Sequence, residues 1–189
     1  MENTRFFENV RAFFARVPRV LLLPLSAVLM GLCLIFSNLG MLQWLALAPA
    51  LYYLLPLAGK IRLRRAYALG FLYFGVFYLV AWHWFVELYP MEFAGLTKGE
   101  AILLIAICWF GLSLLQTIFS ALLFPTFTLL CRHRLAARFP LLKPFLFACA
   151  YTVSEWSQNL TWAGVPFARL SLGQSECGLL FNSAALFGS

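Results

Sequence analysis

Apolar residues fall in blocks that are too long for the strands or core helices of a soluble protein. Residues 20–59 and 101–131 contain no Asp, Glu, Lys, Arg or His, and residues 66–86 contain only His83. A helix of about 20 apolar residues crosses the roughly 30 Å hydrocarbon core of a bilayer. The blocks therefore predict helices that span a membrane.

We predict an all-α integral membrane protein with about five transmembrane helices and the start of a sixth. The first block is long enough for two spans, which divide at the polar Ser37–Gly40 segment. Its prolines are tolerable because neighbouring helices can satisfy the freed backbone groups. The last residues, 177–189, are apolar but too few to cross, so we expect the chain to be truncated. The predicted spans are residues 20–37, 40–59, 66–86, 101–130 with a kink at Pro125, and 144–156.

Residues 1–19 differ from the spans because their apolar positions occupy one helical face. This pattern predicts an amphipathic helix in the membrane interface that ends near Pro18. A signal peptide would resemble it, but the apolar run from Val20 continues into a second span instead of a polar mature region. We therefore divide the chain into this helix and a multi-span membrane domain, residues 20–189. The apolar face of the helix consists of Phe6, Phe7, Val10, Phe13, Phe14 and Val17.

Composition and charge support a membrane protein and indicate its orientation. Charged residues make up 11% of the chain, against about 25% in soluble domains. Twelve of the 14 Lys and Arg residues lie in residues 1–19, 60–65 and 131–143, which alternate with acidic loops. Basic loops face the cytoplasm. We expect a cytoplasmic N-terminus, with residues 87–100 and 157–176 outside, and no binding of nucleic acid.

Few residues suggest catalysis or metal binding. The five cysteines form no CxxC pair and have no metal-ligand spacing, and four of them lie in or beside apolar blocks. Cys177 begins an apolar run with no lysine nearby, so nothing activates its thiol. We therefore expect no catalytic residue, no metal and no cofactor in this chain.

Glu155 lies near the outer end of a predicted span. An ionisable group at this depth is costly and points to function unless it reaches the interface, and both interpretations are open. Gly164 and Pro166, which follow it, predict a re-entrant turn. Trp156, Trp162 and Phe167 could instead form an ordinary interfacial aromatic belt.

The segment from Glu155 to Gln174 resembles a span-end signature of bacterial apolipoprotein N-acyltransferases. In that family a Glu is followed by Gly-Phe-Pro-Trp, then by Leu-Gly and Gln. Glu155, Gly164, Pro166 and Gln174 match the signature, whereas Val165 and Phe167 replace its Phe and Trp.

A second similarity lies in the third predicted span. Gly70, Gly75 and the stretch Trp82-His83-Trp84 resemble a Gly-rich family pattern that ends in Asn-Trp, with His83 in place of the Asn. The resemblance covers the chain from about Leu21 onward. It implies that the candidate lipid and substrate cleft is lined by Trp84, Glu155, Gly164, Pro166, Phe167 and Gln174.

The resemblance implies a bacterial inner-membrane enzyme with two lipid partners. Such an enzyme transfers an acyl chain from a phospholipid donor to the α-amino group of a diacylglyceryl lipoprotein's N-terminal cysteine. The family uses a cysteine thioester, assisted by Glu and Lys, in a nitrilase-like domain outside the membrane. No residue of this chain corresponds to that set, so we expect the chain alone to be inactive.

A different class of protein fits the same composition. The chain could be a non-enzymatic lipid- or solute-binding membrane protein, or a transporter subunit. Intramembrane charge pairs or two interrupted helices related by symmetry would favour a transporter. The sequence displays neither feature, so we favour the acyltransferase membrane domain.

Overall fold

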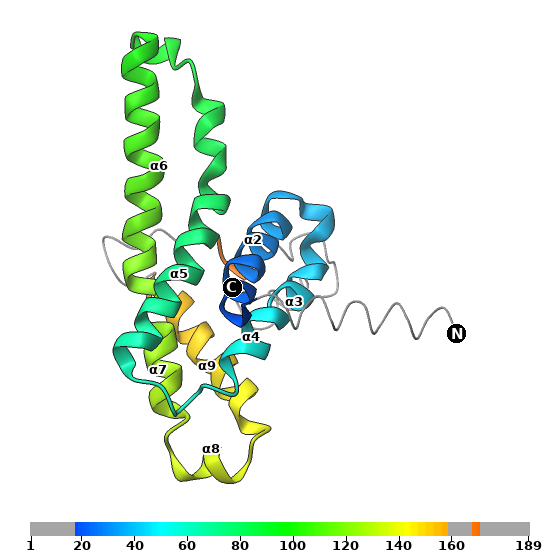
Figure 1. Ribbon diagram of the computed structural model, residues 1–189. Coiled ribbons are helices and arrows are strands. Elements are labelled where there is room, and N and C mark those ends of the chain that lie inside the picture. Colours follow the sequence, from blue (N-terminus) through cyan, green and yellow to red (C-terminus); the bar gives the residue numbers. More distant parts are fainter. Residues whose placement is uncertain (1–17, 159–167, 171–189) are drawn as a thin grey trace.

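The computed structural model describes residues 18–158 and 168–170, and this part of the chain contains helices and turns without a strand (Figure 1). The all-α prediction is confirmed there. The predicted interfacial helix lies outside the described residues except at its end. Short 3-10 helices are labelled η. In chain order the elements are η1 (Arg19–Leu21), α2 (Leu22–Ile35), η2 (Ser37–Leu42), α3 (Gln43–Ala46), α4 (Ala48–Leu54), α5 (Leu63–Ala81), η3 (Trp82–Leu88), η4 (Glu92–Ala94), α6 (Lys98–Ser120), α7 (Leu123–Leu130), α8 (Arg134–Arg138) and α9 (Leu142–Ser157).

Two helical stretches in the described part of the chain are long and apolar enough to cross a membrane. They are Leu63–Leu88, with 26 residues, and Lys98–Leu130, with 33 residues. The stretch Arg19–Ile35 is apolar but shorter. The predicted spans over residues 66–86 and 101–130 are thus confirmed as helices of spanning length. The expected total of five is larger than these helices support.

The prediction of one continuous span over residues 40–59 is wrong. Here η2, α3 and α4 follow one another, and turns replace the helix after Leu54. Proline has no N–H, so Pro49 leaves the carbonyl of Leu45 without its helical donor, and α3 ends at Ala46. Gly59 ends the segment with a φ of +81°, which is the left-handed region. The prolines therefore interrupt this stretch rather than being absorbed within it.

The fourth predicted span breaks near Pro125, as expected. Pro125 cannot donate to the carbonyl of Ala121, four residues earlier, and the interruption between α6 and α7 falls at Ala121 and Leu122. The freed carbonyl accepts only a long hydrogen bond of 3.4 Å from the N–H of Phe124. It also lies close to Gly70 of α5, where a Cβ would stand 2.6 Å from the oxygen.

The core forms where α5 packs against α2, α6 and α7. Buried aromatic rings fill the contact between α5 and α7. The ring of Phe124 lies 5.7 Å from Tyr73 and 6.0 Å from Phe74, measured between ring centroids. Such tilted and edge-on pairs add attraction beyond simple burial.

Charge is separated between the two ends of the bundle. At one end the guanidinium of Arg132 donates from Nη2 to the carbonyl of Ile61 at 3.0 Å, which joins the two basic loops. At the other end α6 begins with a capping box between Thr97 and Glu100. In Figure 1 the α5–α6 connection and α8 lie at opposite ends, and α6 extends well beyond α2. This separation agrees with the predicted loop assignment, while the sidedness stays a prediction.

Candidate functional site

Four buried polar residues form a stripe along one face of α6. Ser113, Gln116, Thr117 and Ser120 are spaced as i, i+3, i+4 and i+7, and each is at most 4% exposed. This spacing places side chains on a single helical face. In a lipid environment polar groups are retained where protein can satisfy them. The stripe therefore marks the face that α6 presents to the rest of the protein.

The stripe is hydrogen-bonded to α5 and to the start of η3. The indole Nε1 of Trp82 donates to Oε1 of Gln116 at 2.8 Å, and the hydroxyls of Tyr78 and Ser120 lie 2.8 Å apart. The two bonds are one helical turn apart on each helix. They hold α5 and α6 in register.

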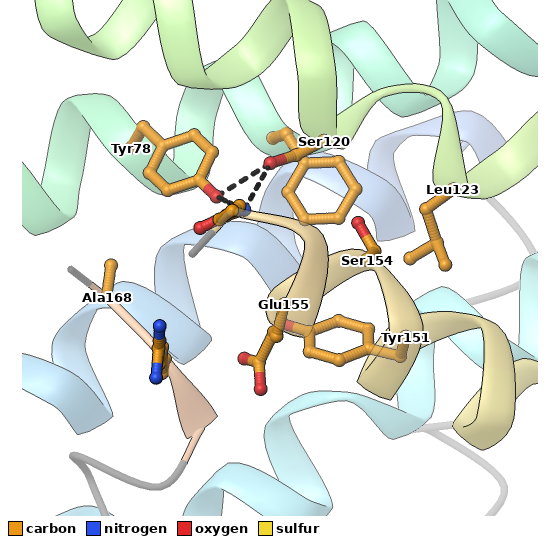
Figure 2. Close-up of a pocket in the computed structure, with 10 residues that line it drawn as sticks. Tyr78, Ser120, Leu123, Tyr151, Ser154, Glu155 and Ala168 are labelled. Carbon is orange, nitrogen blue, oxygen red and sulfur yellow. Dashed lines mark hydrogen bonds between the residues drawn. The ribbon is translucent and has the colours of Figure 1, made fainter. Parts of the chain in front are cut away.

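Helix α9 ends beside Tyr78 and Ser120. Gln158, which directly follows α9, donates from Nε2 to Oγ of Ser120 at 3.0 Å and lies 3.2 Å from the hydroxyl of Tyr78. Figure 2 shows the hydrogen bond between Tyr78 and Ser120. Three helices thus meet at one polar junction, formed by Tyr78, Ser120 and Gln158.

Glu155 lies one turn before Gln158 on α9 and is half-buried. Its Oε1 accepts the backbone N–H of Leu170 at 2.9 Å. Two residues earlier, Ala168 is buried and has a φ of +61°. The carboxylate therefore ties the end of α9 to a backbone segment fifteen residues further along the chain.

The polar junction and Glu155 line one small pocket. Its wall also includes Tyr151, Ser154 and Leu123 (Figure 2). The pocket leaves about 10 Å³ for the centre of a water molecule. A cavity needs roughly 10–15 Å³ on this measure to hold one water. The pocket can accept a small polar group but not a lipid chain. No group of three or more metal-ligating side chains occurs in the described residues.

The pocket is deep relative to the loop between α5 and α6. Ser120 is the last residue of α6, which begins at Lys98, so at about 1.5 Å per residue the two are about 33 Å apart along the axis. The 87–100 loop and the 157–176 segment were both predicted to lie outside. They therefore begin at different levels along α6.

A larger groove lies between α5 and α6, beside the polar stripe. It encloses about 250 Å³ and is lined by Phe71, Gly75, Leu79, Phe110, Ser113, Leu114 and Thr117. The lining is almost entirely apolar, and Gly75 widens it by lacking a side chain. This groove matches an acyl segment in polarity. The polar pocket beside Glu155 does not.

Of the six predicted cleft residues, the structure describes only Trp84 and Glu155. Trp84 is half-buried in η3 and stacks on Phe85, with ring centroids 4.5 Å apart. It is not among the residues that line the pocket of Glu155. The other predicted residues, Gly164, Pro166, Phe167 and Gln174, lie outside the described residues.

The sequence prediction missed Tyr78, Ser120 and Gln158. A signal for Ser120 was present, because the 113–120 stripe is the one helical repeat of polar residues in an otherwise apolar block. No comparable pattern marked Tyr78 or Gln158.

Comparison with known proteins identifies the family. A search of curated proteins and a search of solved structures each give no match. Residues 26–189 match the family described as the apolipoprotein N-acyltransferase N-terminal domain. This match includes most of α2 and every later element of the described residues, together with the polar junction and the α5–α6 groove. The chain belongs to the apolipoprotein N-acyltransferase N-terminal domain family.

Proposed function

We propose that this chain is the membrane domain of an enzyme that N-acylates lipoproteins. The enzyme would take an acyl chain from a phospholipid and transfer it to the α-amino group of a diacylglyceryl lipoprotein's N-terminal cysteine. The family match over residues 26–189 carries this proposal. The two apolar helices of spanning length support it, because both substrates reside in the bilayer.

The groove between α5 and α6 is our candidate for the acyl chain of the phospholipid donor. Its volume and apolar lining suit a hydrocarbon segment. The Trp82–Gln116 and Tyr78–Ser120 hydrogen bonds hold its two walls at a fixed spacing. A rigid groove of this kind would bind the lipid without the entropic cost of ordering the two helices at each turnover.

The acyl transfer itself is assigned to a nitrilase-like domain outside the membrane. Covalent catalysis needs a nucleophile with an oriented base. We therefore expect the 189-residue chain, reconstituted with phospholipid and a diacylated lipopeptide, to give no N-acylation above a protein-free control. Measurable transfer by the chain alone would overturn this assignment.

Two glycine substitutions test the groove in the complete enzyme. A Cβ on Gly75 meets only ordinary contacts, the nearest 3.7 Å away at Thr117, whereas Gly111 of α6 has open space around it. Gly75→Leu should fill the groove and lower N-acylation by tenfold or more, while Gly111→Leu should leave it near wild type. Gly75→Ala should fold normally and give an intermediate rate.

The readout is N-acylation of a diacylated lipopeptide, normalised to the amount of folded enzyme in the membrane. Equal activity of Gly75→Leu and Gly111→Leu at equal abundance would contradict a role for the groove.

A further inference from the structure

The basic end of the bundle carries a second apolar groove, distant from the one between α5 and α6. It encloses about 490 Å³ between α7, α8 and α9. On the same measure the pocket beside Glu155 leaves about 10 Å³, so this groove is far larger. Its lining includes Leu129 and Leu130 of α7, Leu135 of α8, and Leu142 and Leu146 of α9.

Basic residues adjoin the lining residues in the sequence, and no acidic residue is nearby in the sequence. Arg134 and Arg138 belong to α8, which forms one wall, and Lys143 follows Leu142 of the lining. The chain has no Asp or Glu between residues 101 and 154. The cations of this end therefore have no carboxylate of their own loops to neutralise them.

A histidine stands where the apolar lining meets the charged rim. His133 lines the groove, and its Nδ1 accepts the backbone N–H of Leu135 at 3.4 Å. An accepting Nδ1 places the ring proton of a neutral histidine on Nε2. His133 thus retains an N–H donor for an anionic oxygen.

We propose that this groove, formed by α7, α8 and α9, binds one anionic phospholipid, with its acyl chain against the leucines and its phosphate at His133, Arg134 and Arg138. Charge complementarity selects an anionic lipid over a zwitterionic one. Basic pockets between helices on the cytoplasmic side of a membrane bind such headgroups. The site is separate from the proposed acyl-donor groove, so the lipid here would be a bound component and not a substrate.

Native mass spectrometry of the purified full chain tests the proposal. After delipidation, the protein is titrated with phosphatidylglycerol or phosphatidylethanolamine of the same acyl composition. We expect one phosphatidylglycerol to bind more tightly than phosphatidylethanolamine. The double variant Arg134→Gln/Arg138→Gln should weaken phosphatidylglycerol binding by roughly thirtyfold.

Matched variants separate a site from general surface attraction. Arg64→Gln/Arg65→Gln removes the same charge from exposed positions in the first turn of α5 and should change the affinity less than threefold. Leu146→Trp fills the groove without altering charge and should also weaken binding, whereas Leu103→Trp, on the exposed surface of α6, should not. Equal binding of both lipids, or equal loss in the two arginine double variants, would overturn the proposal.

Crosslinking identifies the occupant directly. A photoreactive amino acid at position 135, which lines the groove and is half exposed, should form adducts with phosphatidylglycerol in proteoliposomes. Adducts with this chain's own N-terminal residues, or with a second copy of the chain, would instead show a protein occupant and refute the lipid site.

Discussion

The carbonyl oxygen of Ala121 lies directly against Gly70, at the point where α6 ends and α7 begins. Pro125 leaves this carbonyl without its helical donor, and a Cβ on Gly70 would stand 2.6 Å from the oxygen and 3.2 Å from the Ala121 Cα. Both close atoms belong to the backbone. The break in one helix and the missing side chain of the other are therefore parts of one contact.

Gly70→Ala should destabilise the bundle because the new methyl group would meet the backbone of Ala121, which cannot move aside as a flexible side chain can. Overpacking of this kind costs about 1–3 kcal/mol. Gly111→Ala, a substitution into open space on α6, should be neutral or stabilising by about 0.5–1 kcal/mol. Unfolding free energies measured in mixed micelles will compare them, and equal stability of the two variants would show that the close contact is absent.

Tyr78→Phe should weaken the junction of α5, α6 and α9. The lost hydroxyl bonds to Ser120 and Gln158, and net hydrogen bonds of this kind contribute about 0.5–1.5 kcal/mol. Tyr52→Phe removes the same group from a side chain that is 67% exposed and should have almost no effect. The measurement is again the unfolding free energy, and an equal loss in both variants would argue against a structural junction.

Glu155→Ala should lower N-acylation by the complete enzyme because it releases the backbone of Leu170. Hydrogen bonds to charged groups contribute about 1.5–3 kcal/mol. Glu155→Gln keeps an oxygen that can accept the same N–H and should retain most activity. Hydrogen exchange of the Leu170 amide should accelerate in the Ala variant and less in the Gln variant.

Ile102→Val is the control for Glu155, since the residue is 58% exposed on α6 and the change removes one methylene group. Its activity should match the wild type. Wild-type activity in Glu155→Ala at normal abundance would show that the carboxylate is only an interfacial anchor. Activity lost equally in the Gln and Ala variants would assign the role to charge instead of to the hydrogen bond.

Cysteine accessibility should establish the sidedness of the loops. On a cysteine-free background, position 92 should label from outside, and positions 64 and 134 only after permeabilisation. All three residues are exposed, whereas Ala136 is 1% exposed and would make an uninformative site. Outside labelling at position 64 would reverse the proposed orientation.

The helices of spanning length could be predicted because block length and charge are local properties. The 66–86 and 101–130 blocks became α5–η3 and α6–α7, and the helix is interrupted near Pro125, where a kink was predicted. The prediction of one span over residues 40–59 was wrong because hydropathy measures only how apolar a segment is. It takes no account of the backbone N–H groups that prolines lack. Pro49 changes the backbone hydrogen bonds without changing the apolar pattern.

The polar junction could be predicted only in part. The stripe on α6 is visible as a helical repeat, but its partners are 42 and 38 residues away from Ser120 in the chain. Which Tyr and which Gln meet it depends on how α5 and α9 pack. Glu155 could be singled out because an ionisable side chain in lipid costs free energy. Its partner is the backbone N–H of Leu170, which no side-chain pattern can reveal.

The hydrogen bonds between α5 and α6 have a thermodynamic consequence. Separating two helices that remain in lipid exposes little apolar surface to water, so the step should have a small heat-capacity change. The Trp82–Gln116 and Tyr78–Ser120 bonds would then hold the pair with nearly temperature-independent enthalpy. The stability of this helix pair should fall almost linearly on heating and show no loss on cooling, unlike the curved profile of a water-soluble core.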